Sequence, residues 1–575
     1  MITMMIDNKE VQVPKETTIL EAAREAGINI PTLCAMPEIN HTPGACRICM
    51  VEIDRSRALV ASCVYPVAEG MKVSTHNARV RRARKSVVEF LLSDHPQDCN
   101  TCLKSGHCEL QNVAALVGVR EIHVPRTDFT AHRIDDSSPA LIRDTSNCIH
   151  CLRCVTVCSD IQGVNLLVSA GRGFDSKVVP AMSKDLADSA CTYCGQCAVV
   201  CPTGAIVERD DTERVFEALE DPEKHVVVQG APAIRATLGE EFGMPAGTLV
   251  TGRMIAALRK LGFDKVFDTN FTADLTIIEE GHELLKRVKT GGKLPMITSC
   301  SPGWIKYVEH FYPDLLPNVS TCKSPQQMFG ALAKTYYAED SGIDPKNIFV
   351  VSIMPCTAKK YEALRPEMRS SGFQDVDAVL TTREMGRMIR RAGIDFVNLA
   401  PEDFDAPMGQ YSGAAAIFGA TGGVMEAALR TVYAVVTGKP LENLDIKPVR
   451  GLEGIKAAAV EVGELGNVRV AVSHGLANAR KVLDTVVDGT GDYHFIEIMA
   501  CPGGCVGGGG QSLPVSNEKR QLRARALYRD DATVQEFRQS HENPAIDALY
   551  KDFLKEPLGE KSHKLLHTHY VERGL

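Results

Sequence analysis

The chain has 575 residues, of which 44% are hydrophobic and 24% charged, and its formal net charge is -8. This length exceeds one ordinary hydrophobic core, so we expect several domains. The acidic balance argues against a surface for nucleic acid or for an anionic membrane. We find no apolar run of membrane-spanning length and no export signal, so we expect a cytoplasmic protein without membrane insertion. The twenty cysteines, crowded into short-spaced groups, then indicate metal ligation rather than disulfides.

The first cysteine group follows an N-terminal segment that alternates like a strand, turns at Asp7-Asn8 and continues from Val11 to Val13. Its members are Cys34, Cys46, Cys49 and Cys63. They resemble the plant-type ferredoxin module found in some hydrogenases and in complex I, which binds a 2Fe-2S cluster. Four thiolates also suit zinc, but the long first loop and the strand-like N-terminus favour iron.

A basic stretch at residues 79–85 precedes apolar residues at helical spacing and predicts a helix with a solvated basic face. Beyond this helix lie two histidines and three cysteines, namely His95, Cys99, Cys102, His107 and Cys108. The pattern resembles the site of complex I and some hydrogenases in which one histidine and three cysteines hold a 4Fe-4S cluster. Without that resemblance, His95 is also explained as a histidine at a helix end, and His107 competes with it as the ligand.

The third cysteine group has the strongest local pattern in the chain. Each of its two halves has the CxxCxxCxxxC spacing of bacterial two-cluster ferredoxins, in which the fourth cysteine ligates the other cluster. One 4Fe-4S cluster then takes Cys148, Cys151, Cys154 and Cys201, and the other takes Cys191, Cys194, Cys197 and Cys158. The three groups together form a chain of one-electron carriers, which implies a redox reaction at its far end.

From about residue 224 short apolar strands alternate with helical segments, which indicates α/β layers. We expect strands at residues 225–229, 265–269, 348–354 and 468–472. Loops at strand ends carry three segments that combine cysteine with proline or glycine, namely residues 298–304, 354–360 and 497–511. Cysteine supplies the soft sulfur that iron prefers, and glycine lets backbone amides approach an inorganic group. A glycine-rich turn beside two buried thiols is the plain alternative for the last segment.

Together the three segments closely resemble those of the FeFe-hydrogenases, and the resemblance covers almost the whole chain. It implies the interconversion of H2 with two protons and two electrons. The implied active centre is the H-cluster, a 4Fe-4S unit joined to a diiron subsite with carbon monoxide, cyanide and a bridging azadithiolate. One 2Fe-2S cluster and three accessory 4Fe-4S clusters would accompany it.

The resemblance also implies an α+β multidomain fold. Its expected parts are a plant-type ferredoxin-like domain at 1–78, a 4Fe-4S domain with one histidine and three cysteines at 79–118, a two-cluster ferredoxin domain at 138–210, an α/β H-cluster domain at 224–514 and a small-subunit-like segment at 515–575. We expect the last segment to be structural.

By the same resemblance, Cys356, Cys501 and Cys505 bind the 4Fe-4S part of the H-cluster, and Lys359 donates to a cyanide. Cys505 bridges to the diiron subsite. Further residues of the implied pocket are Pro232, Gln326, Met354, Gly419 and Met499. The plain alternatives are core positions for the methionines and a solvated position for the lysine.

One position departs from the family pattern. Typical members read Thr-Ser-Cys-Cys-Pro, where the first cysteine relays a proton and the second ligates the cluster, whereas here Cys300 is followed by Ser301. Ser301 could ligate through oxygen, Cys300 could shift into the ligand role, or Cys322 could substitute. The resemblance suggests that Ser301 marks the flavin-linked, NAD(P)-reducing members of the family.

Residues 277–287 place two glutamates and an arginine on one helix face. The plain interpretation is an exposed ion pair between Glu283 and Arg287. Matching to the hydrogenase proton path instead assigns a relay to Cys300, Glu280, Ser320, Glu283 and Arg287. Such side chains can hand on protons because each accepts one and donates another.

The electron partner is open at this point, since either ferredoxin or NAD(P), through a flavin-containing hydrogenase subunit, would suit the relay. No GxGxxG fingerprint follows a strand, so a pyridine nucleotide would bind another subunit. Maturation proteins are a further expected partner. Two other functions stay possible. An electron-transfer subunit similar to the complex I large subunit would leave Cys300, Cys356, Cys501 and Cys505 unexplained. A hydrogen sensor usually has an added signalling domain, which is absent here.

Overall fold

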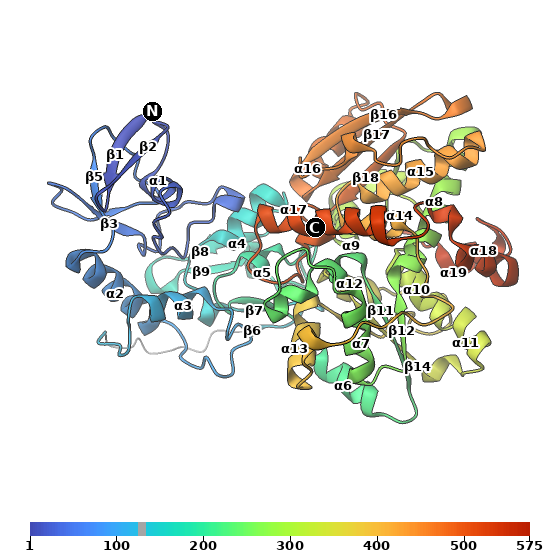
Figure 1. Ribbon diagram of the computed structural model, residues 1–575, viewed down its shortest axis with the longest axis horizontal. Coiled ribbons are helices and arrows are strands. Elements are labelled where there is room, and N and C mark those ends of the chain that lie inside the picture. Colours follow the sequence, from blue (N-terminus) through green and yellow to red (C-terminus); the bar gives the residue numbers. More distant parts are fainter. Residues whose placement is uncertain (125–133, 575) are drawn as a thin grey trace. The chain divides into compact units, whose positions relative to one another are not determined.

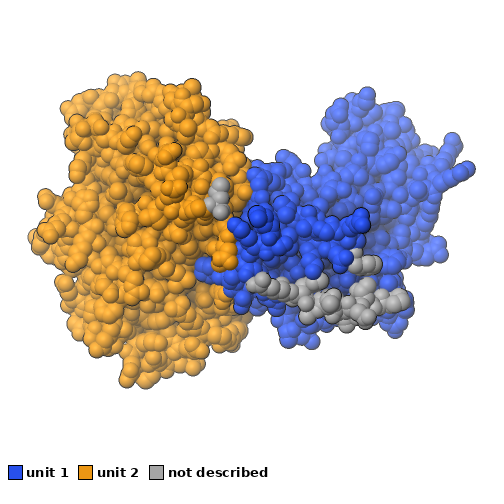
Figure 2. Space-filling model, turned by 180° about the vertical axis from the view of Figure 1, so that it is seen from behind, with its two compact units in different colours: residues 1–160, 165–186, 200–207 blue, residues 161–164, 187–199, 208–575 orange. Residues whose placement is uncertain are grey.

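The computed structural model describes residues 1–124 and 134–574, which form two compact units (Figure 2). The first unit comprises residues 1–160, 165–186 and 200–207, and the second comprises residues 161–164, 187–199 and 208–575. Helices and strands occur in both, so the expected α+β multidomain class is confirmed. Among the helices of the described residues, none is both long enough and apolar enough to cross a membrane.

The first unit opens with a five-stranded sheet of order β2-β1-β5-β3-β4. Its strands are β1 (Ile2–Ile6), β2 (Lys9–Val13), β3 (Met50–Ile53), β4 (Val60–Ala61) and β5 (Lys72–Ser74). β1 and β2 pair antiparallel, and the turn residues Asp7 and Asn8 have positive φ values of 47° and 67°. Asp and Asn tolerate this conformation best among residues with a side chain, so the predicted turn is confirmed.

Helix α2 (Ala78–Ser93) corresponds to the predicted basic helix, but its basic face is not wholly solvated. Arg84 is buried and donates from Nη2 to Met50 O at 2.8 Å. Burial lowers the pKa of this guanidinium, although it stays charged. The prediction is therefore wrong at Arg84, because the long arginine stem lies along apolar surface and its head ties α2 to β3.

Shorter elements complete the N-terminal half. They are α1 (Ile19–Glu25), α3 (Glu109–Leu116), β6 (Ile134–Asp135), β7 (Leu141–Asp144), α4 (Arg153–Thr156), β8 (Leu167–Ala170), β9 (Lys177–Pro180), α5 (Gln196–Val200) and β10 (Ile206–Glu208). Of the expected ligands, Cys154 lies in α4 and Cys197 in α5, and most of the others lie in loops.

The second unit contains two four-stranded sheets (Figure 1). One is parallel throughout, with order β12-β11-β14-β15, and consists of β11 (His225–Gly230), β12 (Lys265–Asp268), β14 (Ile348–Ile353) and β15 (Ala378–Leu380). The other has order β13-β18-β17-β16 and consists of β13 (Met296–Ile297), β16 (Ile455–Glu461), β17 (Asn467–His474) and β18 (Phe495–Met499). All four strands expected from the sequence are present.

Helix α8 (Thr269–Thr290) contributes to both cores of this unit. It begins at Asp268, whose side chain caps the first turn, and ends at Gly291 in the left-handed conformation with φ 71°. Its buried side chains divide between the core of the parallel sheet, with Phe271, Leu275 and Ile278, and the core of the other sheet, with Ala273, Ile277 and Leu284. A helix that is buried on nearly all sides can carry polar groups only if they find partners there.

The other helices of the second unit are α6 (Thr212–Glu220), α7 (Thr251–Leu261), α9 (Pro302–Phe311), α10 (Pro325–Ala333), α11 (Tyr336–Ser341), α12 (Ala358–Ala363), α13 (Thr382–Arg391), α14 (Gly413–Ala416), α15 (Gly423–Thr437), α16 (Leu476–Val487), α17 (Asn517–Arg529), α18 (Pro544–Leu549) and α19 (Glu560–Leu566). The last three form the C-terminal segment. Arg523 of α17 donates to Glu240 at 2.6 Å, and Tyr550, after α18, donates to Glu279 at 2.5 Å. The segment is thus tied to the rest of its unit by buried polar contacts.

A buried ion pair joins Arg235, which follows β11, to Asp268 at the end of β12. Nη2 of Arg235 lies 2.9 and 2.8 Å from the two carboxylate oxygens, and both side chains are 0% exposed. Arg235→Met leaves the buried carboxylate of Asp268 without this partner, so we expect a loss of about 3–5 kcal/mol of unfolding free energy. Denaturation followed by the fluorescence of Trp304, the single tryptophan, measures it. Arg259→Met breaks a more exposed pair with Glu402 and should lose less than about 1 kcal/mol; equal losses would contradict the argument.

Candidate functional site

The second unit contains a cavity at the places where the chain leaves β13, β14 and β18. Five cysteines line it: Cys194, and from the three segments Cys300, Cys356, Cys501 and Cys505. Loops at the carboxyl ends of strands are the usual position of a site in α/β folds. The three segments that the sequence singled out therefore meet in one place.

Burial dominates the chemistry of these thiols. It raises the pKa of Cys505 to about 12 and holds the pKa of Cys300, Cys356 and Cys501 above the ordinary thiol value. No disulfide joins these four cysteines. Thiolates gathered in an apolar pocket repel one another unless cations neutralise them, and iron is a soft enough cation to do so. The donor set fits an iron–sulfur group.

The glycines of the run 503–510 let protein loops touch through their backbones. A Cβ on Gly508 would lie 2.0 Å from Pro355 O, and one on Gly509 would lie 2.2 Å from Cys194 O. Gly510 N donates to the same Pro355 oxygen at 2.9 Å. The expectation that these glycines serve an inorganic group is therefore incomplete, because the space that they leave is already filled by backbone from neighbouring loops.

The remaining residues that the resemblance places in the pocket all line the cavity, namely Pro232, Gln326, Met354, Lys359, Gly419 and Met499. Lys359 is buried, and its Nζ donates to Glu362 Oε2 at 2.8 Å and to Cys300 O at 3.1 Å. Gln326 Nε2 donates to the same carboxylate at 3.1 Å, while its Oε1 has no hydrogen-bond partner. The plain alternative of a solvated lysine is wrong.

Sequence reasoning missed two buried carboxylates at this site. Glu362 holds both Lys359 and Gln326, and its position three residues after the lysine on one helix could have indicated the pair. Glu497 accepts hydrogen bonds from Gly422 N at 2.6 Å and from Met425 N at 2.7 Å, and burial raises its pKa. The only signal for Glu497 was a charged residue within an otherwise apolar strand.

Ser301 lines the cavity beside Cys300, and its Oγ accepts a hydrogen bond from Ala500 N at 3.3 Å. Cys322 is not among the described residues that line the cavity. Its Sγ instead donates to Glu283 Oε2 at 3.8 Å. This position counts against Cys322 as a cluster ligand and narrows the choice to the oxygen of Ser301 and the sulfur of Cys300.

A row of polar side chains leads away from the cavity. Burial, together with the charge of Glu283, raises the pKa of Glu280 to about 8, and a hydrogen bond with Ser320 opposes the rise. Ser320 Oγ donates to Glu283 Oε2 at 2.9 Å, and Arg287 Nη2 donates to Glu283 Oε1 at 2.6 Å. The predicted ion pair is present, but its side chains are only 10% and 13% exposed, so the expectation of an exposed pair is wrong.

The cysteines of the first group, Cys34, Cys46, Cys49 and Cys63, are all buried, and Cys46 N donates to Cys34 Sγ at 3.5 Å. In the second group His95 is buried and its Nδ1 has no hydrogen-bond partner, whereas His107 is exposed. An imidazole nitrogen buried without a partner suits a metal ligand. The structure favours His95 over His107.

The other expected ligands are distributed over both units. Cys102 lies beside Gly204, where a Cβ would come within 2.8 Å of the sulfur, and Cys99 and Cys108 belong to the same unit. A second, smaller cavity is lined by Cys148, Cys151, Cys154 and Cys201. The first unit also contains Cys158, and the second contains Cys191, Cys194 and Cys197.

Family models match nearly the whole chain. They are described as the C-terminal domain of the iron only hydrogenase large subunit at residues 224–509, the iron hydrogenase small subunit at 517–573, a 2Fe-2S iron-sulfur cluster binding domain at 1–78, the NADH-ubiquinone oxidoreductase-G iron-sulfur binding region at 84–123 and the ferredoxin-like domain of NADH-quinone oxidoreductase subunit 3 at 138–207.

Individual relatives agree with these matches. The chain is 51% identical to the NADP-reducing hydrogenase subunit HndD of Solidesulfovibrio fructosivorans over 100% of this chain and 99% of that protein. It is 41% identical to iron hydrogenase 1 of Clostridium pasteurianum over 99% of this chain and 100% of that protein. A solved structure of the [FeFe]-hydrogenase HydA1 from Chlamydomonas reinhardtii is 44% identical, with a TM-score of 0.57, and covers 64% of this chain and 100% of that one.

Full-length identity of this size, together with a cavity that gathers the cysteines of all three segments, leaves one assignment. The family uses 2Fe-2S and 4Fe-4S clusters with an H-cluster, and the matched domains account for each kind. The chain belongs to the FeFe-hydrogenases, as a catalytic subunit that acts on H2 and carries N-terminal iron–sulfur domains.

Proposed function

We propose that the cavity of the second unit holds the H-cluster and that the chain is the hydrogen-converting subunit of a larger NAD(P)-reducing complex. The observation that carries this proposal is the meeting of Cys300, Cys356, Cys501 and Cys505 with the buried Lys359. The bound H-cluster supplies the centre at which hydrogen is split or formed. The protein supplies position, electrostatics and access. A pure electron-transfer subunit would not account for this cavity.

Three cysteines, Cys356, Cys501 and Cys505, bind the 4Fe-4S part of the cluster in this proposal. Ser301 is the fourth ligand, because its oxygen lines the same cavity and this leaves Cys300 to relay protons. Lys359, which is hydrogen-bonded to Glu362, would donate a hydrogen bond to a cyanide of the bound cluster. The methionines and Pro232, Gln326 and Gly419 shape the pocket and exclude water.

Protons pass between Cys300 and the surface through Glu280, Ser320, Glu283 and Arg287. The raised pKa of Glu280 means that its carboxyl holds a proton at neutral pH and can donate it to Cys300. The Ser320 hydroxyl then reloads Glu280: it gives its own proton to Glu280 and takes a proton from Glu283, with whose Oε2 it shares a hydrogen bond of 2.9 Å. Arg287 fixes Glu283 by the ion pair and marks the outer end of this route.

Electrons pass through one 2Fe-2S cluster and three accessory 4Fe-4S clusters in this proposal. Their ligands are the three cysteine groups described above, with His95 as the single histidine. In this proposal the final acceptor is NADP+ or NAD+ on a flavin-containing partner subunit in the cytoplasm. The name of the relative HndD, an NADP-reducing hydrogenase subunit, supports NADP+ as the acceptor. Ferredoxin is the alternative acceptor.

An infrared spectrum of the anaerobically matured chain tests the proposed centre. Metal-bound carbon monoxide and cyanide absorb in a window that is free of protein bands. We expect such bands, and we expect them to shift under hydrogen. Their absence in protein with filled relay clusters, made by a maturation system that activates a known hydrogenase, would overturn the proposal.

The partner is tested by the acceptor that the isolated chain can use. With hydrogen as donor, the chain alone should reduce a one-electron dye but not NADP+, because it lacks a dinucleotide fingerprint after a strand. Adding the flavin-containing subunit should restore NADP+ reduction. Reduction of NADP+ by the pure chain would refute a separate nucleotide-binding subunit.

A further inference from the structure

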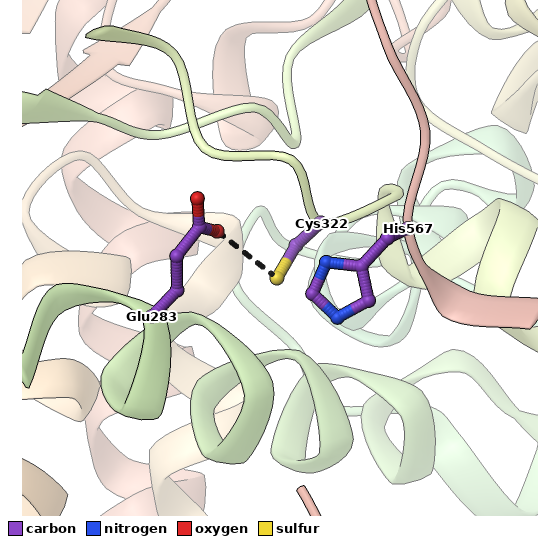
Figure 3. Close-up of side chains that lie close together, drawn as sticks. All are labelled: Glu283, Cys322 and His567. Atoms are coloured by element: carbon purple, nitrogen blue, oxygen red, sulfur yellow. Dashed lines mark hydrogen bonds between the residues drawn. The ribbon is translucent and has the colours of Figure 1, made fainter. Parts of the chain in front are cut away.

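Three side chains of different chemistry meet beside the proton path proposed above (Figure 3). Glu283 belongs to α8, Cys322 lies in the loop before α10, and His567 follows α19 near the C-terminal end. A carboxylate oxygen, the sulfur and a ring nitrogen all lie within 4.8 Å of one another, and all three residues are buried. Figure 3 shows the thiol between the carboxylate and the imidazole.

Backbone pairing holds His567 opposite Cys322. The two residues form an isolated antiparallel β-bridge. Hydrogen bonds of 2.8 and 2.7 Å flank it, from Lys323 N to Leu566 O and from Thr568 N to Thr321 O. Paired residues of an antiparallel bridge project their side chains to the same face. The imidazole therefore cannot leave the thiol unless the C-terminal segment unpairs.

The thiol of Cys322 is a proton donor to Glu283. Its Sγ lies 3.8 Å from Glu283 Oε2, the same oxygen that accepts from Ser320 Oγ at 2.9 Å. Burial, followed by the charge of Glu283, raises the pKa of the thiol well above its ordinary value, so the proton stays on sulfur at neutral pH. Cys322 and Ser320 thus contact one carboxylate oxygen from two directions.

His567 has a partner at each ring nitrogen. Nε2 lies 3.1 Å from Glu279 Oε2, and Nδ1 lies 2.8 Å from Thr321 Oγ1. Burial alone would raise the pKa of Glu279, but hydrogen bonds from His567 and Tyr550 lower it, so Glu279 is a carboxylate. A carboxylate at Nε2 keeps a proton on that nitrogen. Nδ1 is then the nitrogen that carries the lone pair of the neutral ring, and Figure 3 shows it on the side of Cys322.

Solvent reaches this imidazole from the side of α19. His567 is 9% exposed, and its ring centroid lies 4.4 Å from that of His563, which is exposed. Imidazole exchanges protons with water in the neutral range more readily than any other unperturbed side chain. The histidine pair therefore gives the cluster a contact with water that is separate from the one at Arg287.

Carboxylate, thiol and imidazole could also bind a zinc ion. One contact argues against that use. Glu283 is already neutralised by the guanidinium of Arg287 at 2.6 Å, so a divalent cation at Glu283 would have to compete with that charge.

We propose that His567 and Cys322 form a second proton entrance, which joins the route from Arg287 at Glu283. The inference rests on the proposed function, since it adds a branch to the proton path given there. In the step, the S–H bond of Cys322 breaks as its proton passes to Glu283 Oε2, and the sulfur regains a proton from Nδ1 of the imidazolium form of His567. One proton moves inward and no electron is exchanged.

Two parallel entrances have a kinetic signature that one entrance lacks. We would compare the matured full-length chain with Arg287→Met, with Cys322→Ala and with both changes together, by dye-driven hydrogen production. Each single change should lower turnover less than about tenfold, because the other entrance still delivers protons. The double change should lower it at least about a hundredfold. A double variant no slower than Arg287→Met alone would overturn the proposal.

Two further variants separate proton delivery from packing. His567→Phe removes the outer member of the same entrance. In the Arg287→Met background it should therefore lower hydrogen turnover as much as Cys322→Ala does. Cys322→Ser keeps a small donor and should restore at least half of the lost turnover in that background. If Cys322→Ser is as slow as Cys322→Ala while the infrared bands of the active centre are unchanged, the side chain does not relay protons.

A second readout does not depend on hydrogen turnover. The chain purified without the maturation system still contains Glu280, whose protonated carboxyl has a carbonyl infrared band that shifts in D2O. If this band is absent from the spectrum of Glu280→Gln, it belongs to Glu280. After rapid mixing with D2O, the shift should slow at least about tenfold only when Arg287 and Cys322 are both replaced. An equal rate of exchange in all forms would refute the second entrance even if the hydrogenase assignment holds. Slower exchange in the double variant alone would support the second entrance even if the chain shows no hydrogen turnover.

Discussion

Glu280→Gln should lower hydrogen turnover by about a thousandfold and leave the active centre assembled. The carboxyl lies between Ser320 and the cavity, is almost completely buried and holds a proton at neutral pH. An amide of the same size cannot release a proton to Cys300 and take another, and proton transfer by a positioned side chain is worth about 10²–10⁴-fold. Dye-driven hydrogen production measures the loss, and infrared spectra of the same samples show whether the centre is intact.

Asp274→Asn is the matched control. Asp274 lies on the same helix, is buried, and burial raises its pKa to about 6. It contacts Ser412 and Asn543 rather than the path. Its amide variant should keep turnover within about twofold. If both variants lose activity alike, the effect belongs to the packing of α8 and not to proton transfer.

The same change should alter how stability depends on pH. The carboxyl of Glu280 keeps its proton up to about pH 8 when the chain is folded, but loses it near its ordinary pKa of 4.5 when the chain is unfolded. Between these values the folded chain binds more protons, so this group makes stability fall as pH rises, by an amount of the order of 4 kcal/mol at pH 8. The melting temperature of Glu280→Gln, measured relative to that of wild type, should therefore increase as the pH rises from 5 to 8. A difference that does not vary with pH would contradict the raised pKa.

Gly508→Ala should prevent the active centre from assembling. Its new Cβ would lie 2.0 Å from Pro355 O and 3.1 Å from Cys505 O, both of them backbone atoms that cannot rotate away. The loops that carry Cys356 and Cys505 must then separate by more than 1 Å, and a misplacement of about that size can cost about 10²-fold in rate. We expect the carbon monoxide and cyanide bands to be absent and turnover to fall at least about a hundredfold.

Gly281→Ala is the contrasting glycine. A Cβ there meets only Val432 at 3.5 Å, which is ordinary contact, and alanine suits a helix interior better than glycine by about 0.5–1 kcal/mol. This variant should assemble the centre and be slightly more stable. Iron retained by the N-terminal clusters in Gly508→Ala would show that the damage is local. Normal infrared bands in Gly508→Ala would mean that the two loops tolerate a side chain.

Local patterns in the sequence predicted what local chemistry determines. The turn at Asp7 and Asn8 follows from residue preference, and the strands at 225–229 and 348–354 follow from unbroken apolar runs between turn residues. The three cysteine segments were expected at strand ends, and the cavity lies there. Such features need no knowledge of distant partners.

Buried charges were not predicted, because their partners lie far away in the sequence. Glu497 is a charged residue within an apolar strand, and only the fold shows the Gly422 and Met425 amides that donate to it. Arg84 was expected in solvent, and only the fold shows the Met50 carbonyl that holds it. The C-terminal segment was expected to be structural alone, since nothing local links His567 to Glu279. Each case needs a tertiary contact that periodicity does not encode.

The strand order of the second sheet determines when its strands can pair during biosynthesis. β13, which leads to Cys300, pairs in this sheet only with β18, and β18 leads to Cys501 and Cys505. About 200 residues separate Cys300 from Cys505. At about 5–20 residues per second, the ribosome needs roughly 10–40 s to cover that distance. During that interval a nascent chain presents the edge of β13 without its β18 partner, and it exposes thiols that the folded chain buries.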